Sequence, residues 1–220
     1  MDEMLKTTYG KTKLQSYKKS TSNEASLFGR GNTEEIAYAA GCTACSAIIT
    51  PTEIIVGNSG DSRAVFAKKS GDKYLAIELS IDHKPELSTE KQRIERAGGF
   101  VEDNRVKGVL NLSRSLGDLE YKSDASIPLS EQMITAMPEI KTQKLDADSA
   151  FLIIACDGIW DCLTSQQAVD EFGELIGNKK REKLSSAIEE VFDKIIAADV
   201  ASSGGIGCDN MTCVVIQFKN

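Results

Sequence analysis

Short apolar segments separated by turn residues dominate the chain from residue 40 onward. Pro, Gly, Asp or Ser separates four segments rich in Ile, Val and Ala, which predicts a meander of antiparallel strands. These segments are 44–50, 53–58, 62–68 and 74–79. A continuous apolar run over 151–156 predicts a strand inside a sheet, and a similar run over 211–218 predicts a final buried strand.

Helical spacing of apolar residues appears mainly at the two ends of the chain. The predicted helices are 3–19, interrupted by Gly10, then 88–97, 164–177 and 181–198. Thr164 and Gln167 form a capping box that starts the third of these helices. Residues 20–34 are polar and glycine-rich without periodicity, which predicts a flexible surface loop.

Strands come first along the chain, and helices are grouped late, before a last strand that returns to the sheet. That order predicts an α+β sandwich of two antiparallel sheets flanked by helices, because repeated strand–helix alternation is missing. A chain of 220 residues that is 41% hydrophobic fits one domain, 1–220, better than two.

Net charge and cysteine content restrict the classes of function. A net charge of -7 argues against binding to nucleic acid or to an anionic membrane surface. No apolar run has the length of a membrane span, and the first residues lack the features of a secretory signal. Six cysteines in a chain of this size favour free thiols, and we expect a cytoplasmic or nuclear location.

Aspartates recur at tight turns beside the apolar segments. Asp157-Gly158, with Asp161 four residues later, follows the central strand, and Asp61, Asp118 and Asp209 occupy similar turns. Each turn alone is ordinary, because Asp often hydrogen-bonds its own backbone. Converging carboxylates repel unless they are protonated or bind cations, and oxygen-only ligands favour Mg²⁺ or Mn²⁺.

The same turns belong to a longer set of motifs that resembles the metal-dependent protein phosphatases of the 2C type. The resemblance extends in order from about residue 2 to 218. Its motifs are Ala40-Gly41-Cys42-Thr43-Ala44, Gly60-Asp61-Ser62-Arg63-Ala64, Asp82-His83-Lys84-Pro85, Ala97-Gly98-Gly99, Leu112 to Asp118, Ala155 to Asp161, and Asp209-Asn210-Met211-Thr212.

The resemblance implies a β-sandwich with a metal centre at one end. Asp157 resembles a ligand of one of two core ions and Asp209 its partner, while Asp61 and Asp161 resemble ligands of a third, weaker ion. Gly158 lets the backbone approach the metals. The implied activity is hydrolysis of phosphoserine or phosphothreonine in phosphoproteins by a metal-activated water, with Mg²⁺ or Mn²⁺ as cofactor. A non-catalytic scaffold that retains the fold is the alternative.

An earlier segment of the family pattern is not found in these 220 residues. It contains a phosphate-binding arginine and an Asp-Gly-His-Gly-Gly turn that supplies a bridging ligand and a proton donor. The resemblance therefore implies missing N-terminal strands, little turnover by these residues alone, and a sheet edge open to a partner chain. A fragment, a non-catalytic relative, or a chain completed by another polypeptide would each explain this.

Several other residues have two interpretations. His83 is either a general acid or, as we favour, a loop residue that fixes backbone. Arg63 and Arg114 either clamp phosphate or, more commonly for arginine beside aspartate, form structural ion pairs. Trp160 is expected in the core. Residues 119–135 are either a recognition flap or an ordinary connecting loop.

Overall fold

The computed structural model describes residues 1–18, 36–177 and 183–219, so the predicted loop at 20–34 lies outside the described residues. The chain forms two compact units, each built from two separate stretches. Unit 1 comprises Met1–Ala44 and His83–Pro138, and unit 2 comprises Cys45–Asp82 and Glu139–Asn220. That the chain is a single domain stays a prediction.

Unit 2 contains two antiparallel sheets. The four-stranded sheet has the order β11-β10-β4-β5, and the three-stranded sheet has the order β2-β3-β9. The strands are β2 (Ala44–Ile49), β3 (Glu53–Ser59), β4 (Arg63–Ser70), β5 (Lys73–Glu78), β9 (Glu139–Lys144), β10 (Ser149–Ala155) and β11 (Cys213–Gln217). The helices are α5 (Asp157–Trp160), α6 (Ser165–Gly177) and α7 (Leu184–Ile195).

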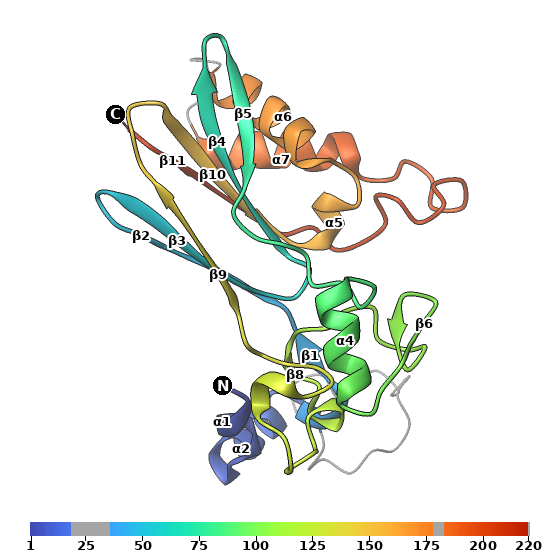
Figure 1. Ribbon diagram of the computed structural model, residues 1–220. Coiled ribbons are helices and arrows are strands. Elements are labelled where there is room, and N and C mark those ends of the chain that lie inside the picture. The colour runs from blue at the N-terminus through green and yellow to red at the C-terminus, as the bar shows by residue number, and fades with distance from the viewer. Residues whose placement is uncertain (19–35, 178–182, 220) are drawn as a thin grey trace. The chain divides into compact units, whose positions relative to one another are not determined.

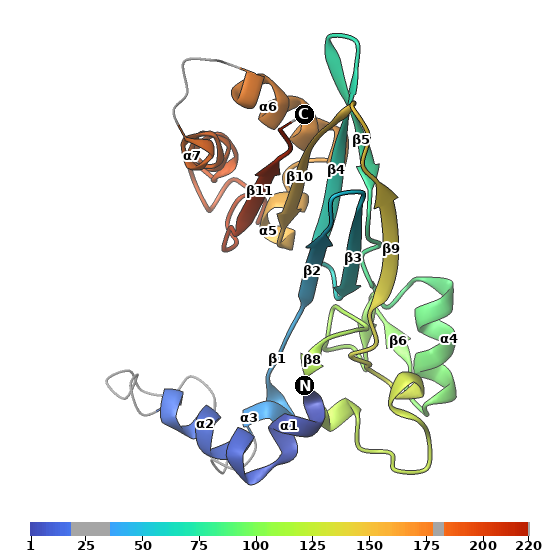
Figure 2. The same ribbon diagram turned by 90° about the vertical axis from the view of Figure 1, so that its left-hand side faces the viewer.

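Alternate residues of β4 and β10 pack against opposite layers. Phe66 and Leu152 join Ile54 of β3 in a core between the two sheets. Val65 and Ile153 face the other way and pack with residues of α6 and α7. Figures 1 and 2 show this order of helices, four-stranded sheet and three-stranded sheet. Burial on both faces explains why residues 151–156 are apolar without alternation.

The predicted α+β class with two antiparallel sheets is confirmed. The capping box of α6 is also present, since the amide of Thr164 donates to Gln167 Oε1 at 2.9 Å and the amide of Gln167 donates to Thr164 Oγ1 at 3.3 Å. α7 is shorter than the predicted helix and ends at Ile195.

Two predictions about the strands are wrong. The first four strands do not form one meander, because the chain leaves the three-stranded sheet after β3 and enters the other sheet at β4. The turn at Gly60, with φ of 122°, makes this change of sheet. β11 is an edge strand and not a buried one, and Val214 on it is 52% exposed. β9 was not predicted.

Unit 1 is mostly helices and short strands. Its elements are α1 (Asp2–Lys6), α2 (Thr8–Lys18), α3 (Ile36–Ala39), α4 (Ser88–Arg96), β1 (Gly41–Cys42), β6 (Val101–Glu102), β7 (Arg105–Val106), β8 (Leu116–Gly117), and the 3-10 turns η3 (Leu119–Tyr121) and η4 (Leu129–Glu131). None of the helices in the described residues is long and apolar enough to cross a membrane.

The first helix is interrupted at Thr7 and not at Gly10. Thr7 has extended backbone at the end of α1, and Gly10 lies inside α2. A Cβ on Gly10 would lie 2.2 Å from the carbonyl oxygen of Met4, so glycine allows α2 to pass close to α1. The helix α4 agrees with prediction. Asp103 and Asn104, both at positive φ, form the turn of the hairpin β6–β7.

A buried charged cluster fixes α4 to the rest of unit 1. Glu90, 1% exposed, accepts from Arg93 at 2.6 Å, from Arg114 at 2.6 Å and from the hydroxyl of Ser113 at 2.7 Å. Burial acts to raise the pKa of Glu90, but the hydrogen bonds from Arg114 and Ser113 and the charge of Arg93 together lower it to about 2.

Because the folded-state pKa of Glu90 lies below its ordinary value of 4.5, this carboxylate stabilises the protein above about pH 4.5. Its contribution of roughly 3 kcal/mol should be lost as pH falls toward 2. We expect Glu90→Gln to lower the free energy of unfolding at pH 7 by about 3–5 kcal/mol. The variant should also show a weaker acid dependence than the wild type in denaturant titrations.

The control is Glu131→Gln, which removes an exposed ion pair with Arg96 in the same unit. We expect that change to alter stability by less than about 1 kcal/mol at any pH. If the free energy of unfolding depends on pH identically in the wild type and in Glu90→Gln, the lowered pKa of Glu90 is refuted.

Candidate metal centre

The pairing of β10 with β11 brings two of the predicted ligands to one end of the four-stranded sheet. Ala155 pairs with Cys213, and the amide of Cys156 donates to the carbonyl of Thr212 at 3.1 Å. The strands are antiparallel, so the turn that leaves β10 and the turn that enters β11 lie at the same end. Asp157 lies two residues after the end of β10, and Asp209 lies four residues before the start of β11.

Gly158 and Asn210 are in direct contact between these two turns. A Cβ on Gly158 would lie 2.3 Å from the carbonyl oxygen of Asn210 and 3.5 Å from Cβ of Asp209. Only glycine permits this approach. The two turns that contain Asp157 and Asp209 therefore pack against each other, although they are about fifty residues apart in the sequence.

The thiol of Cys156 joins the same two turns. Its Sγ donates to the carbonyl of Asn210 at 3.2 Å and accepts from the amide of Thr212 at 3.2 Å. On the neighbouring strand, burial and then the charge of Cys156 raise the pKa of Cys213 to about 12, which keeps it a thiol. All six cysteines are free, as predicted.

Each of the two carboxylates is oriented by the next backbone amide. Asp157 Oδ1 accepts from the amide of Gly158 at 3.0 Å, and Asp209 Oδ1 accepts from the amide of Asn210 at 2.7 Å. Asp157 is partly buried and Asp209 is exposed. Such local bonds restrict side-chain rotation before any ligand arrives.

Asp161 lies one helical turn after Asp157. Its amide donates to the carbonyl of Asp157 at 2.8 Å, and it caps the C-terminus of α5. Residues four apart share one side of a helix, so both carboxylates lie on the same side of α5. Asp161 is exposed to solvent.

Asp61 reaches the same end of the sheet from the third segment. It is 2% exposed and precedes β4 by two residues. β4 begins at Arg63, which pairs with Ala155, the last residue of β10. The structure therefore brings Asp61, Asp157, Asp161 and Asp209 to one end of unit 2.

The acidic turn at Asp118 belongs to unit 1 and not to this group. Its carboxylate accepts from the hydroxyl of Ser115 at 2.5 Å, and its amide donates to the carbonyl of Ala40 at 3.0 Å. A Cβ on Gly41 would lie 2.0 Å from Asp118 Oδ2, so this turn has its own packing role.

The residues fit a divalent cation in donor chemistry and, for two of them, in placement. Carboxylate oxygens without imidazole or thiolate suit Mg²⁺ or Mn²⁺. Within residues 1–18, 36–177 and 183–219, no three side chains of His, Cys, Asp or Glu are grouped so that they could hold a metal. That Asp157 and Asp209, with the backbone at Gly158, hold a metal stays a prediction.

The other candidate residues take part in ion pairs, backbone hydrogen bonds or core packing. Arg63 forms an ion pair with Asp82 at 2.8 Å, and Arg114 forms one with Glu90, which supports the ion-pair interpretation of both. His83 is 1% exposed, and its carbonyl accepts from the amide and hydroxyl of Ser113. Trp160 is 7% exposed and belongs to the core of unit 2.

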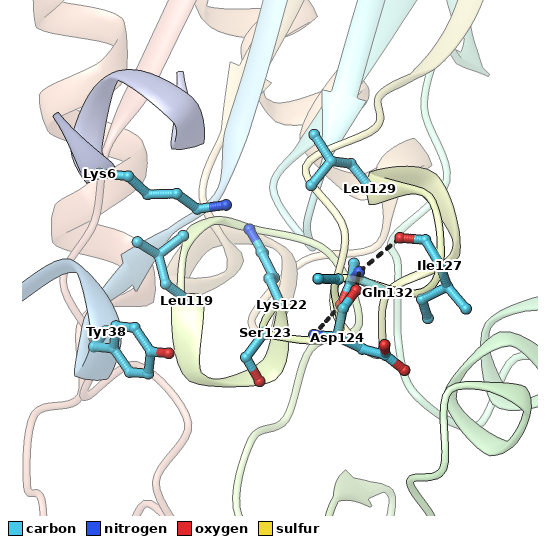
Figure 3. A pocket seen from close by; sticks show the side chains of 10 residues that line it. Lys6, Tyr38, Leu119, Lys122, Ser123, Asp124, Ile127, Leu129 and Gln132 are labelled. Carbon is cyan, nitrogen blue, oxygen red and sulfur yellow. Dashed lines mark hydrogen bonds between the residues drawn. The ribbon is translucent and has the colours of Figure 1, made fainter.

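Part of the segment 119–135 lines a cavity of about 370 Å³ in unit 1. Lys6 and Lys122 both line this cavity, and Figure 3 shows their side chains there. Burial, and more weakly the charge of Lys6, lower the pKa of Lys122 in spite of its 2.6 Å bond to Asp2. Residues of the segment 119–135 therefore pack around this cavity.

Gly158→Ala tests the contact between the two ligand-bearing turns. The added methyl group would overlap the carbonyl of Asn210, so we expect the variant to lose about 1–3 kcal/mol in free energy of unfolding. Gly177→Ala is the matched control, because a Cβ there would meet nothing within 4 Å and should change stability by less than about 1 kcal/mol. Equal effects in urea titrations would contradict the contact.

Comparison with known proteins identifies relatives over most of the chain. Residues 3–204 match the family model described as Protein phosphatase 2C. The chain is 49% identical over 179 residues to "Probable protein phosphatase 2C 21" of Arabidopsis thaliana, covering 81% of this chain and 48% of that protein. It is 41% identical over 221 residues to "Probable protein phosphatase 2C 3" of Paramecium tetraurelia, covering 100% of this chain and 67% of that protein.

Solved structures share the fold. A phosphatase from Toxoplasma gondii has a TM-score of 0.63 at 29% identity, covering 76% of this chain and 50% of its own. A serine-threonine phosphatase 2C from Toxoplasma gondii has a TM-score of 0.64 at 23% identity, covering 83% and 60%. The chain spans about half the length of the plant relatives it matches. On the match over residues 3–204 and these identities, the chain belongs to the protein phosphatase 2C family.

Proposed function

We propose that the protein is a serine/threonine protein phosphatase that depends on Mg²⁺ or Mn²⁺. The observation that carries the proposal is the contact of Gly158 with Asn210, because it packs the Asp157 turn against the Asp209 turn. Membership of the family gives the reaction class. The substrates would be phosphoproteins.

In this proposal Asp157 and Asp209, with the backbone of Gly158, hold two core ions, and Asp61 and Asp161 contribute to a third. The chemistry that such ions supply when bound is a water of lowered pKa and neutralisation of charge on the phosphoryl oxygens. The amides of Gly158 and Asn210 keep two of the carboxylates in orientation. Fixed ligands reduce the reorganisation that binding would otherwise need.

The surroundings of Cys156 support attack by water over attack by a thiol. Cys156 uses its sulfur in two backbone hydrogen bonds, and within the described part of the chain no hydrogen bond joins it to a basic side chain. A cysteine nucleophile normally has a neighbouring base or cation that stabilises the thiolate. The proposal therefore includes no covalent phosphoenzyme.

A partner chain and a location complete the proposal. β11 is an edge strand whose residues Cys213–Gln217 include no charge and no proline, features that leave an edge open to pairing. We propose that another polypeptide segment covers it. Six free thiols suit a reducing compartment, the cytoplasm or nucleus.

A second candidate is a non-catalytic protein that binds phosphoproteins. It is favoured by one observation, the lack of any group of three metal-ligating side chains in the part of the chain that the structure describes. Such a protein would keep the fold and bind phosphopeptide without hydrolysis.

The test is Mn²⁺-dependent phosphate release from a phosphothreonine peptide by the purified chain, with binding of the same peptide measured in parallel. We expect little release by these 220 residues alone, and Asp157→Asn and Asp209→Asn should lower the measured rate further, by at least about 100-fold, because each removes a ligand charge. Asp193→Asn, at an exposed position of α7, should leave the rate unchanged. Peptide binding without release would favour the second candidate, and neither binding nor release would refute both.

A further inference from the structure

Arg63 lies among the segments that contain the predicted ligands of unit 2. It begins β4 and pairs in register with Ala155, the residue two positions before Asp157. In the other direction along the chain it is two residues after Asp61. The backbone of Arg63 is thus adjacent to two of the acidic segments.

The guanidinium group binds three further partners. Nε and Nη2 donate to the two carboxylate oxygens of Asp82 at 3.0 and 2.8 Å, and Nη1 donates to the hydroxyl of Ser165 at 2.9 Å. That hydroxyl in turn donates to Glu78 Oε1 at 2.6 Å. The bidentate geometry fixes the plane of the guanidinium group.

The guanidinium group also lies over the indole ring of Trp160. The central carbon of the guanidinium lies 5.1 Å from the ring centroid, a distance typical of a cation–π contact. The indole Nε1 donates to the carbonyl of Ala155 at 2.8 Å, which fixes the ring against β10. Trp160 contacts both the arginine and the core, and it is the last residue of α5, directly before Asp161.

Electrostatics agree with this arrangement. The hydrogen bond with Asp82 raises the pKa of Arg63 above its ordinary value, and the charges of Glu78 and Asp161 act in the same direction. Asp161 therefore lies within the field of Arg63.

We infer that Arg63 is a positioning residue for the metal centre: through Asp82, Ser165 and Trp160 it holds the turn of α5 in which Asp157 and Asp161 lie. This inference rests on the proposed function only in that the centre binds a metal. The contacts of Arg63 do not depend on that function. Arg63 is too engaged with protein groups to act as a phosphate clamp. Its loss should loosen the ligands without removing any of them.

Trp160 provides a direct readout, because it is the single tryptophan of the chain. We expect Arg63→Lys, which keeps the charge but loses the planar fork, to increase acrylamide quenching of Trp160 fluorescence at least twofold in metal-free protein. The same variant should weaken Mn²⁺ binding about 10- to 100-fold in calorimetry, as is usual when support of a metal ligand is lost. Asp82→Asn should have the same effects.

The control is Lys68→Gln, which removes an exposed ion pair with Asp146 from the same strand β4. It should leave quenching and Mn²⁺ affinity within twofold of the wild type, while circular dichroism verifies that each variant is folded. Unchanged quenching in Arg63→Lys and Asp82→Asn would overturn the inference. A wild type that binds no Mn²⁺ would overturn the proposed function, whereas the fluorescence comparison would still decide the role of Arg63.

Discussion

Antiparallel pairing of β10 with β4 on one side and β11 on the other is the constraint on which unit 2 depends. Through this pairing, three distant segments begin or end at the same end of the four-stranded sheet, and their turns contain the aspartates of the candidate metal centre. Burial on both faces fixes the register of β10. A shift by one residue would move Phe151 and Ile153 to the face that Leu152 occupies, and Leu152 to theirs.

Two charged clusters illustrate different uses of arginine in the same chain. Glu90 is buried in unit 1 and accepts hydrogen bonds from Arg93, Arg114 and Ser113, which fix α4. Arg63 instead binds Asp82 and covers an aromatic ring beside the acidic turns of unit 2. Glu90 is buried and Arg63 is partly buried, and each is hydrogen-bonded to groups of opposite charge, which is the condition for burial of an ion to be tolerated.

Much of the fold could be predicted from the sequence because local and global preferences agree. The apolar run of β10, the capping box of α6 and the helical spacing of α4 are local signals, and each element formed as expected. The change of sheet at Gly60 was not predictable from periodicity, since strands of either sheet have similar patterns. β11 resembled a buried strand because its inward residues are all apolar, while its edge position depends on which neighbour pairs with it.

The acidic turns were recognised by residue type, but the placement of Asp118 in unit 1, and the partner of Arg63, required three-dimensional contacts.

The contact between Gly158 and Asn210 also has an implication for how the chain can vary. The segment that contains α6 and α7 starts and finishes at these two turns, so its two ends are adjacent at one end of the sheet. Residues between the two turns can be inserted, deleted or exchanged without changing the distance between the turns, provided that the buried faces of α6 and α7 are kept. Diversification among relatives is therefore expected to concentrate in the connections around these helices, while the two anchoring turns keep a constant length.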